Sequence, residues 1–240
     1  MPRPDRDDAP RDASRLPSLD ARSALAAVPL FQDLPDDVLA RLAGRARRLS
    51  CDAEQVVFLE GDVAEGLYVV AAGWLKVTKI SAAGREQVLR DVGPGDVLQE
   101  IGLLLETPNP ASLVALEPAT LWLLPRAAVL RVTQETPSLL WPLLQNLARR
   151  LLATVDLVES LSLRTLEARL ARYLLDRADE DVFERRKWAT QAELAARLGT
   201  VPDVLHRVLR GLVEDGLIRV ERQRVLLLDR EGLEAKARLA

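Results

Sequence analysis

The 240-residue sequence contains a single cysteine, Cys51, and a single histidine, His206. One cysteine excludes an intramolecular disulfide bond, and it excludes a zinc or iron–sulfur site built from four cysteines of one chain. One histidine excludes a three-histidine metal site and leaves one possible centre for a catalytic dyad. Because the sequence places no nucleophile beside His206, we expect no metal site and no enzyme.

The chain also lacks long apolar runs and is poor in aromatic residues, which make up 4% of it. No run approaches the roughly 20 apolar residues that span a bilayer, and the start of the chain lacks the apolar core of a secretory signal. We therefore expect a cytoplasmic protein without a membrane partner. Proline, arginine and aspartate alternate in residues 1–22 with little apolar surface, so this segment is predicted to be disordered.

Residues 30–50 are predicted to contain a short helix. Pro35 fits its beginning, and Asp36 and Asp37 fall in the first turn, where the helix dipole favours acidic side chains. Its apolar stripe would consist of Leu34, Val38, Leu39 and Leu42.

Residues 54–124 change to short β-rich runs, which glycine-containing turns such as Gly61-Asp62 and Gly93-Pro94-Gly95 separate. Short strands with frequent turn signals are typical of an antiparallel sandwich or barrel. The glycines lack the spacing and the strand–helix context of a phosphate-binding or dinucleotide-binding loop. We predict a β-domain whose glycines form tight turns.

A long helix is predicted over residues 136–163. Pro137 fits its start, whereas Pro142 indicates a kink or a later beginning. Apolar positions recur at alternating spacings of four and three, as in a parallel two-chain coiled coil, and a core helix of its own domain is the alternative. The predicted dimer seam is Leu140, Leu144, Leu147, Leu151, Thr154, Val158 and Leu161.

The C-terminal segment predicts a winged helix-turn-helix. Thr190 and Glu193 have the spacing of a capping box that opens one helix, and Gly199 ends this helix. Pro202 stands at the first position of the next helix. Two strand-like runs, at 217–222 and 224–229, would then form a hairpin as the wing.

Five apolar residues, Val204, Leu205, Val208, Leu209 and Leu212, define the inner side of the second helix. Its outer side carries Asp203, His206, Arg207 and Arg210, on the helix that such motifs insert into the major groove of DNA. Arg207 can donate to O6 and N7 of guanine, and Asp203 can accept from N4 of cytosine or orient Arg207. We expect His206 to be solvated or to contact DNA.

Other polar residues around the motif could contact the DNA backbone. The C-terminal segment has a slight excess of basic residues, which alone is too small to prove nucleic-acid binding. Residues that could meet phosphates are Arg185, Arg186, Lys187, Arg219, Arg222 and Arg224. The complete predicted DNA-binding set is Thr190, Gln191, Thr200, Pro202, Asp203, His206, Arg207, Arg210 and Arg222.

A β-domain, a long helix and a winged helix-turn-helix in this order resemble the CRP/FNR family of bacterial transcription regulators, over about residues 24–232. The stretches that carry the resemblance include "VVFLEGDVAEGLYVVAAGWLKVTK", "GPGDVLQEIGLL" and "ELAARLGTVPDVLHRVLRGLVEDGLI". The resemblance implies an α+β fold with an N-terminal β-roll, similar to a cyclic-nucleotide-binding jelly roll. The implied domains are a disordered segment 1–22, a β-roll sensor domain 23–135, a dimerisation helix 136–163 and a winged helix-turn-helix domain 164–240.

The resemblance also implies partners. Family members act as homodimers that bind a roughly palindromic double-stranded DNA operator and regulate transcription, with RNA polymerase as a further partner. The family's frequent Arg-Glu-x-x-x-Arg pattern is reduced here to Pro202, Asp203 and Arg207, so an operator that differs from the common one is expected. The alternative is a small-ligand module that acts through protein contacts, with a helix-turn-helix decayed by Pro202.

The implied effector pocket departs from that of cyclic-AMP-binding members. Their Gly-Glu pair is Gln99-Glu100 here, and the Arg-Ser pair that binds the cyclic phosphate is matched by Asn109-Pro110. Losing the arginine removes a charge-assisted contact, so no cofactor is certain and cyclic AMP is disfavoured. Another ligand and effector-independent activity both stay open. The tentative effector set is Gln99, Glu100, Ile101, Asn109, Ala111, Ser112 and Thr154.

Other sensory chemistries of the family fit poorly. The chain lacks the cysteine set that holds an iron–sulfur cluster in oxygen-sensing members, and Cys51 and His206 are poorly placed as haem ligands. Cys51 is either a thiol sensor or a small core residue.

Overall fold

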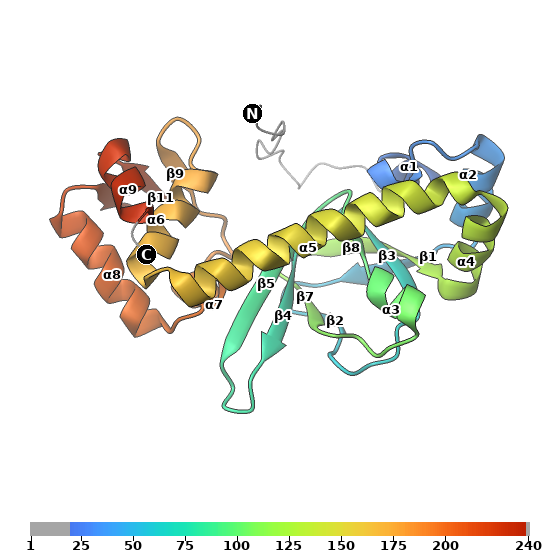
Figure 1. Ribbon diagram of the computed structural model, residues 1–240, viewed down its shortest axis with the longest axis horizontal. Coiled ribbons are helices and arrows are strands. Elements are labelled where there is room, and N and C mark those ends of the chain that lie inside the picture. Colours follow the sequence, from blue (N-terminus) through green and yellow to red (C-terminus); the bar gives the residue numbers. More distant parts are fainter. Residues whose placement is uncertain (1–19, 239–240) are drawn as a thin grey trace.

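The computed structural model describes residues 20–238 and consists of a β-roll, a long helix and a helical C-terminal domain (Figure 1). Most of the segment predicted to be disordered lies outside the described residues. For residues 20–22 the prediction is wrong, because helix α1 (Ala21–Ala26) begins within it. The Asp20 carboxylate accepts a 2.9 Å hydrogen bond from the Ser23 N–H, and Leu25 is fully buried in the core. This cap and this burial offset the entropy of ordering.

The predicted short helix within residues 30–50 is confirmed, and Pro35 is its N-cap residue. After the short 3₁₀ helix η2 (Pro29–Phe31), helix α2 spans Asp36–Ala43. Strand β1 (Arg47–Cys51) follows and pairs antiparallel with β8 (Ala119–Pro125). Strand β1 was not predicted, because its hydrogen-bond partners belong to the distant strand β8 and are not visible in its own sequence.

Two four-stranded antiparallel sheets form the β-roll, in the orders β1-β8-β3-β6 and β2-β7-β4-β5. They enclose a core that includes Tyr68, Leu75, Leu113 and Leu121. The predicted β-domain is therefore confirmed. Its remaining strands are β2 (Val56–Phe58), β3 (Gly66–Ala72), β4 (Leu75–Ile80), β5 (Glu86–Val92), β6 (Val97–Leu98) and β7 (Ser112–Ala115).

A second apolar core lies between the N-terminal helices and the sheet that contains β3. It includes Leu25, Phe31, Leu67 and Leu124. Two helices that the sequence did not predict complete this domain, α3 (Glu100–Leu105) and α4 (Arg126–Glu135). Both are short and lack a side-chain N-cap, so they carry little local signal.

Helix α5 (Leu140–Leu163) follows the 3₁₀ turn η3 (Pro137–Leu139) and runs from the β-roll to the C-terminal domain (Figure 1). Pro142 lies in its first turn, where a backbone N–H would have no partner within the helix. The later beginning is therefore the correct reading of Pro142. Among described residues, Leu143 is the one buried side chain of α5.

The C-terminal domain contains the two helices of the predicted motif, α7 (Gln191–Arg197) and α8 (Pro202–Glu214). The predicted hairpin is β10 (Ile218–Val220) paired with β11 (Arg224–Leu227). A third strand, β9 (Val182–Glu184), pairs with β11 and was not predicted. Helices α6 (Leu166–Arg177) and α9 (Arg230–Ala237) pack on the same apolar core.

In the part of the chain that the structure describes, no helix combines the length and the apolar character needed to cross a membrane.

The turns of the β-roll give a stability prediction. Gly73 and Gly84 both have left-handed backbone angles, with φ of +82° and +76°. An added Cβ would lie 2.5 Å from the Pro118 carbonyl oxygen at Gly73, but would meet nothing within 4 Å at Gly84. We expect Gly84→Ala to cost about 1–2 kcal/mol from backbone strain alone.

Gly73→Ala should cost clearly more, because the Pro118 backbone must also move. Urea denaturation of both variants measures the difference. Equal losses of unfolding free energy would contradict the close approach at Gly73.

Candidate nucleic-acid interface and ligand pocket

Helix α8 presents its polar side to solvent. Leu205, Leu209 and Leu212 are buried against the domain core, as the apolar spacing predicts. The side chains predicted to contact DNA from this helix are all exposed, namely Asp203, His206, Arg207 and Arg210. A helix that buries one stripe in this way can enter a groove with the opposite side.

The turn between α7 and α8 sets the position of this surface. Gly199 takes a left-handed φ of +66°, and the Thr200 N–H donates to the Ala195 carbonyl at 3.0 Å. Thr200 itself is partly buried. A shallow hollow joins the N-terminus of α7 to α8, and it is lined by Gln191, Pro202, Asp203, His206 and Arg207.

Two further members of the predicted DNA-binding set, Thr190 and Arg222, lie outside the lining of this hollow. Thr190 caps α7, since its hydroxyl accepts from the Glu193 N–H at 3.2 Å. The second hydrogen bond of the predicted capping box, from the Thr190 N–H to the Glu193 carboxylate, does not form. The Glu193 carboxylate binds Lys76 and Arg197 instead. Arg222 is exposed in the turn between β10 and β11, where a wing contacts the DNA backbone.

Three of the arginines proposed for phosphates are engaged within the chain. Arg185 donates to the Ala189 carbonyl at 2.9 Å, and Arg224 donates to Glu221 at 2.7 Å. The guanidinium of Arg186 lies 4.2 Å from the ring centroid of Trp74, which belongs to the β-roll. The structure therefore favours Lys187, Arg219 and Arg222, which are exposed.

The predicted ligand pocket centres on Glu100, whose side chain is completely buried at the start of α3. Its carboxylate accepts from Asn146 Nδ2 at 2.6 Å and from Arg150 Nη1, both on α5. Arg150 also donates to the Val97 carbonyl. Burial raises the pKa of the Glu100 carboxyl, and the Arg150 charge opposes this shift.

Sequence reasoning missed the α5 residues of this cluster. Asn146 and Arg150 are four apart, so their spacing indicates a shared face of α5, but the sequence does not show that this face meets Glu100, which is 46 and 50 residues away. Arg90 of β5 points to the same place, with Nη2 3.5 Å from the Val97 carbonyl. Burial and the neighbouring Arg150 charge lower the pKa of Arg90 to about 10.

The other tentative effector residues are only partly gathered here. Asn109 is 3% exposed, and its Oδ1 and the Oε1 of Gln99 have no hydrogen-bond partner among the described residues. The Ser112 hydroxyl accepts from the Glu60 N–H at 2.9 Å, and Ala111 is buried.

Two residues of the tentative effector set do not point into the pocket of their own chain. Ile101 is 45% exposed on the outer side of α3. Thr154 is exposed on α5, and its hydroxyl donates to the Arg150 carbonyl at 2.9 Å. A ligand contact by Thr154 would therefore require a second chain beside this one.

Cys51 is buried in the β-roll core, and burial followed by the Asp52 charge raises the pKa of its thiol. Because the reactive form of cysteine is the thiolate, the core reading is favoured over a thiol sensor. Among residues 20–238 there is no group of three or more histidine, cysteine or acidic side chains that could hold a metal ion.

Comparison with known proteins identifies this arrangement. The "Cyclic nucleotide-binding domain" family matches residues 48–136, and the "Crp-like helix-turn-helix domain" family matches residues 168–236. The "Cyclic AMP receptor protein" of Thermus thermophilus is 33% identical over 196 residues, covering 80% of this chain and 88% of that protein. The chain belongs to the CRP/FNR family of transcription regulators.

Two further transcription regulators are similar to this chain. The "Probable transcriptional regulator flp" of Lacticaseibacillus casei is 31% identical over 219 residues, covering 89% of this chain and 98% of that protein. A solved structure of a CRP-family transcriptional regulator from Thermus thermophilus has a TM-score of 0.63 at 27% identity, covering 79% of this chain and 96% of that chain. The predicted family and α+β fold are confirmed, and this protein is a CRP/FNR-type transcription regulator with a helix-turn-helix DNA-binding domain.

The exposed α8 side predicts different roles for two arginines. Arg207→Ala should weaken binding to a selected operator by about 1–3 kcal/mol, while leaving affinity for random duplex nearly unchanged. Arg222→Ala should weaken both alike, because a phosphate contact reads no sequence.

Fluorescence anisotropy with an operator selected from bound genomic fragments, and with a scrambled duplex, measures both effects. Similar losses for the two variants on scrambled DNA would count against the assigned roles.

Proposed function

We propose that the protein works as a homodimer that reads a roughly palindromic DNA operator with its two α8 helices. RNA polymerase is the further proposed partner, through which the bound dimer changes transcription. The proposed location is the bacterial cytoplasm. The observation that carries the proposal is the apolar stripe that α5 leaves uncovered. Leu144 is 56% exposed, Leu151 66% and Val158 58%.

The exposed stripe differs in detail from the seam predicted by sequence. Leu140, Leu144, Leu151, Thr154 and Val158 are exposed, whereas Leu147 and Leu161 are partly covered by their own chain. Leu161 is covered because it lies against the turn at Gly199, where an added Cβ would be 2.7 Å from its Cδ2. The exposed side gains Trp141, Leu152 and Val155.

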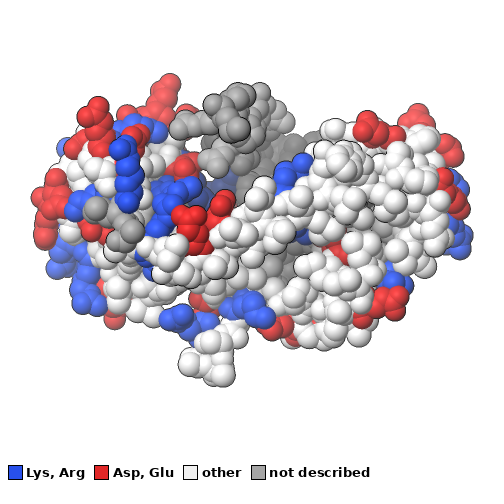
Figure 2. Space-filling model, viewed as in Figure 1, with Lys and Arg blue, Asp and Glu red and all other residues white. Residues whose placement is uncertain are grey.

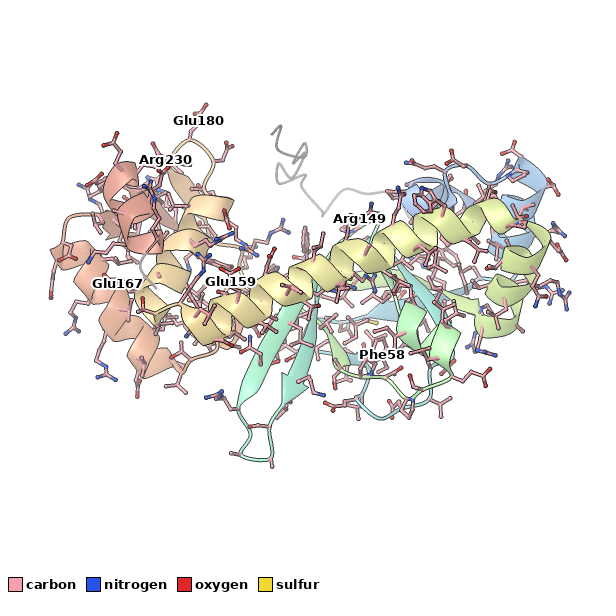
Figure 3. All side chains as sticks on the ribbon, viewed as in Figure 1. Phe58, Arg149, Glu159, Glu167, Glu180 and Arg230 are labelled. Atoms are coloured by element: carbon pink, nitrogen blue, oxygen red, sulfur yellow. The ribbon has the colours of Figure 1, made fainter. Side chains whose placement is uncertain are left out.

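The surroundings of the stripe suit association with a second copy. The face of the molecule that contains α5 is mainly uncharged along this helix, and charged side chains gather toward the two ends (Figure 2). Helix α5 carries four charged residues, of which Arg149 on its β-roll half and Glu159 on its C-terminal half are labelled in Figure 3; the other two are Arg150 and Asp156. Since burying one leucine side chain contributes about 1.5–3 kcal/mol, several such residues from each copy support a stable dimer.

DNA reading follows from the dimer. A two-fold pair of α8 helices would enter successive major grooves on one side of the duplex, about 34 Å apart. The exposed Arg207 and Arg210 favour DNA over the alternative of a module that acts only through protein contacts. Pro202 does not disrupt the motif, because it stands at the first position of α8, where its missing N–H costs nothing.

A small ligand in the β-roll is the proposed regulator. The cluster of Glu100, Asn146 and Arg150 supports this, because it joins the pocket to the helix that carries the dimer stripe. A relative in Mycobacterium tuberculosis, 26% identical, is named a "CRP-like cAMP-activated global transcriptional regulator". Here Asn109 and Pro110, which match the Arg-Ser pair, offer no charged or hydroxyl contact to a cyclic phosphate, so another ligand is favoured over cyclic AMP.

The stripe predicts that Leu151→Asp yields single chains, because a buried carboxylate at the seam is strongly unfavourable. The variant should also lose operator affinity, by at least about tenfold, since half of the contacts are removed. Val63→Asp is the matched control, because Val63 is also highly exposed, at 83%, but lies in the loop between β2 and β3. Light scattering measures the mass, and a dimeric Leu151→Asp protein would contradict the proposed interface.

The pocket predicts that cyclic AMP at millimolar concentration leaves the melting temperature unchanged. A ligand that binds only the folded state must raise it. Differential scanning fluorimetry with and without the nucleotide tests this. An upward shift would show that Glu100 and its neighbours suffice for binding.

A further inference from the structure

We propose that four charged residues fasten helix α7 to the β4–β5 hairpin and hold the DNA-binding domain in the orientation that binds the operator. These residues are Lys76, Asp91, Glu193 and Arg197, and we name them the α7 latch. They act as positioning residues, because none of them belongs to the exposed side of α8. The inference rests on the proposed function, since it concerns how the same DNA-binding surface is aimed.

The latch joins parts of the chain that are more than one hundred residues apart. Lys76 Nζ lies 2.5 Å from Glu193 Oε1. Arg197 donates two hydrogen bonds to the Asp91 carboxylate, from Nη2 to Oδ1 at 2.6 Å and from Nε to Oδ2 at 3.1 Å. The side chains of Lys76 and Arg197 are only 8% and 7% exposed, so solvent screens these pairs little.

The two halves of the latch are complementary because of their backbone positions. Lys76 and Asp91 are direct partners in the antiparallel register of β4 and β5. Glu193 and Arg197 are four apart on α7 and bind each other at 2.7 Å. The hairpin therefore presents Lys76 and Asp91, with Glu86 also bound to Lys76 at 2.8 Å, and α7 presents Glu193 and Arg197. Across the boundary, Lys76 faces Glu193 and Asp91 faces Arg197.

This pairing explains the incomplete capping box of α7. Glu193 has the position to bind back to the helix start, but its carboxylate serves Lys76 and Arg197. Burial alone would raise the pKa of Glu193, but the hydrogen bonds from Lys76 and Arg197 outweigh it and lower the pKa. The contact of Glu193 with the β-roll therefore replaces the local hydrogen bond that a capping box would form.

Neighbouring contacts fix the same boundary without covering α8. Arg186 stacks on Trp74, and the Gln87 side-chain amide donates to the Arg197 carbonyl at 3.4 Å. Gly199 lies close to Gln87 and Leu161, which ties the turn of the motif to β5 and α5. Figure 1 shows α7 beside β5, with α8 on the outer side of the domain.

The latch also shares a strand with the ligand pocket. Asp91 directly follows Arg90, and successive side chains of a strand point to opposite faces. Arg90 approaches the Val97 carbonyl beside Arg150, while Asp91 binds Arg197. Any displacement of β5 at the pocket therefore moves the latch as well.

A buried charge network of this kind is a means of fixing one arrangement more than a source of stability. Without it, α7 would lose its registered partners, and each DNA-binding domain would sample several orientations. Specific binding needs both α8 helices at the spacing of the half-sites, whereas nonspecific binding needs only positive charge near phosphates. Loss of the latch should therefore affect the operator selectively.

The test uses charge reversal in the full chain. Asp91→Arg should weaken operator binding by about tenfold or more, with little change on random duplex, because it sets like charges together in a buried place. The double variant Asp91→Arg with Arg197→Asp should recover part of this loss, because the two reversed side chains attract each other across the boundary, although each then lies beside a like charge on its own element, Lys76 or Glu193. Arg230→Asp, which breaks the exposed pair with Asp181 inside the C-terminal domain, is the control that should bind normally.

Dimer mass and circular dichroism show whether each variant is folded, and Asp91→Asn, which removes the charge at constant size, replaces Asp91→Arg if that variant is not. Unchanged operator affinity in the folded single variant would overturn the latch, and so would tighter binding or a double variant that recovers nothing. Failure of the unmodified protein to dimerise or to bind any operator would instead refute the proposed function.

Discussion

The uncovered apolar stripe of α5 is the constraint on which the rest of the structure depends. Leu144, Leu151 and Val158 are exposed along this 24-residue helix, and Leu143 is the one buried residue in the described part of α5. An apolar stripe of this length is costly in water, and a second copy can cover it symmetrically. In the proposed dimer the two DNA-binding domains would stand at one end of a common axis, so one stripe would determine both the assembly and the number of half-sites.

Helix α5 also has a polar side, which binds the predicted ligand pocket. The same helix therefore carries both the pocket contacts and the proposed dimer stripe. Asn146 and Arg150 reach the buried Glu100, which without them would be an uncompensated charge in the β-roll. On the far side of the same domain, β4 and β5 hold α7 through the latch. In this proposal, a ligand that competes for Glu100 or Arg90 would act on both α5 and strand β5, which carries Asp91 of the latch.

Much of this arrangement could be predicted from the sequence, because local patterns carried it. The spacing of Leu205, Leu209 and Leu212 predicted which side of α8 faces outward, and the glycine-containing turns predicted the β-domain. Tertiary contacts overrode local signals elsewhere: β1 pairs with β8 instead of extending α2, and Glu193 leaves its capping position for Lys76. The pocket partners on α5 and the third strand β9 were missed because their roles depend on distant segments.

The stoichiometry of the unmodified protein on DNA tests the central claim most directly. Multi-angle light scattering of the purified chain, alone and bound to a selected operator duplex, measures the mass of each species. The account predicts two chains in the free protein and two chains on each duplex. A single chain in both samples would contradict it, because the α5 stripe would then be uncovered in the functional state.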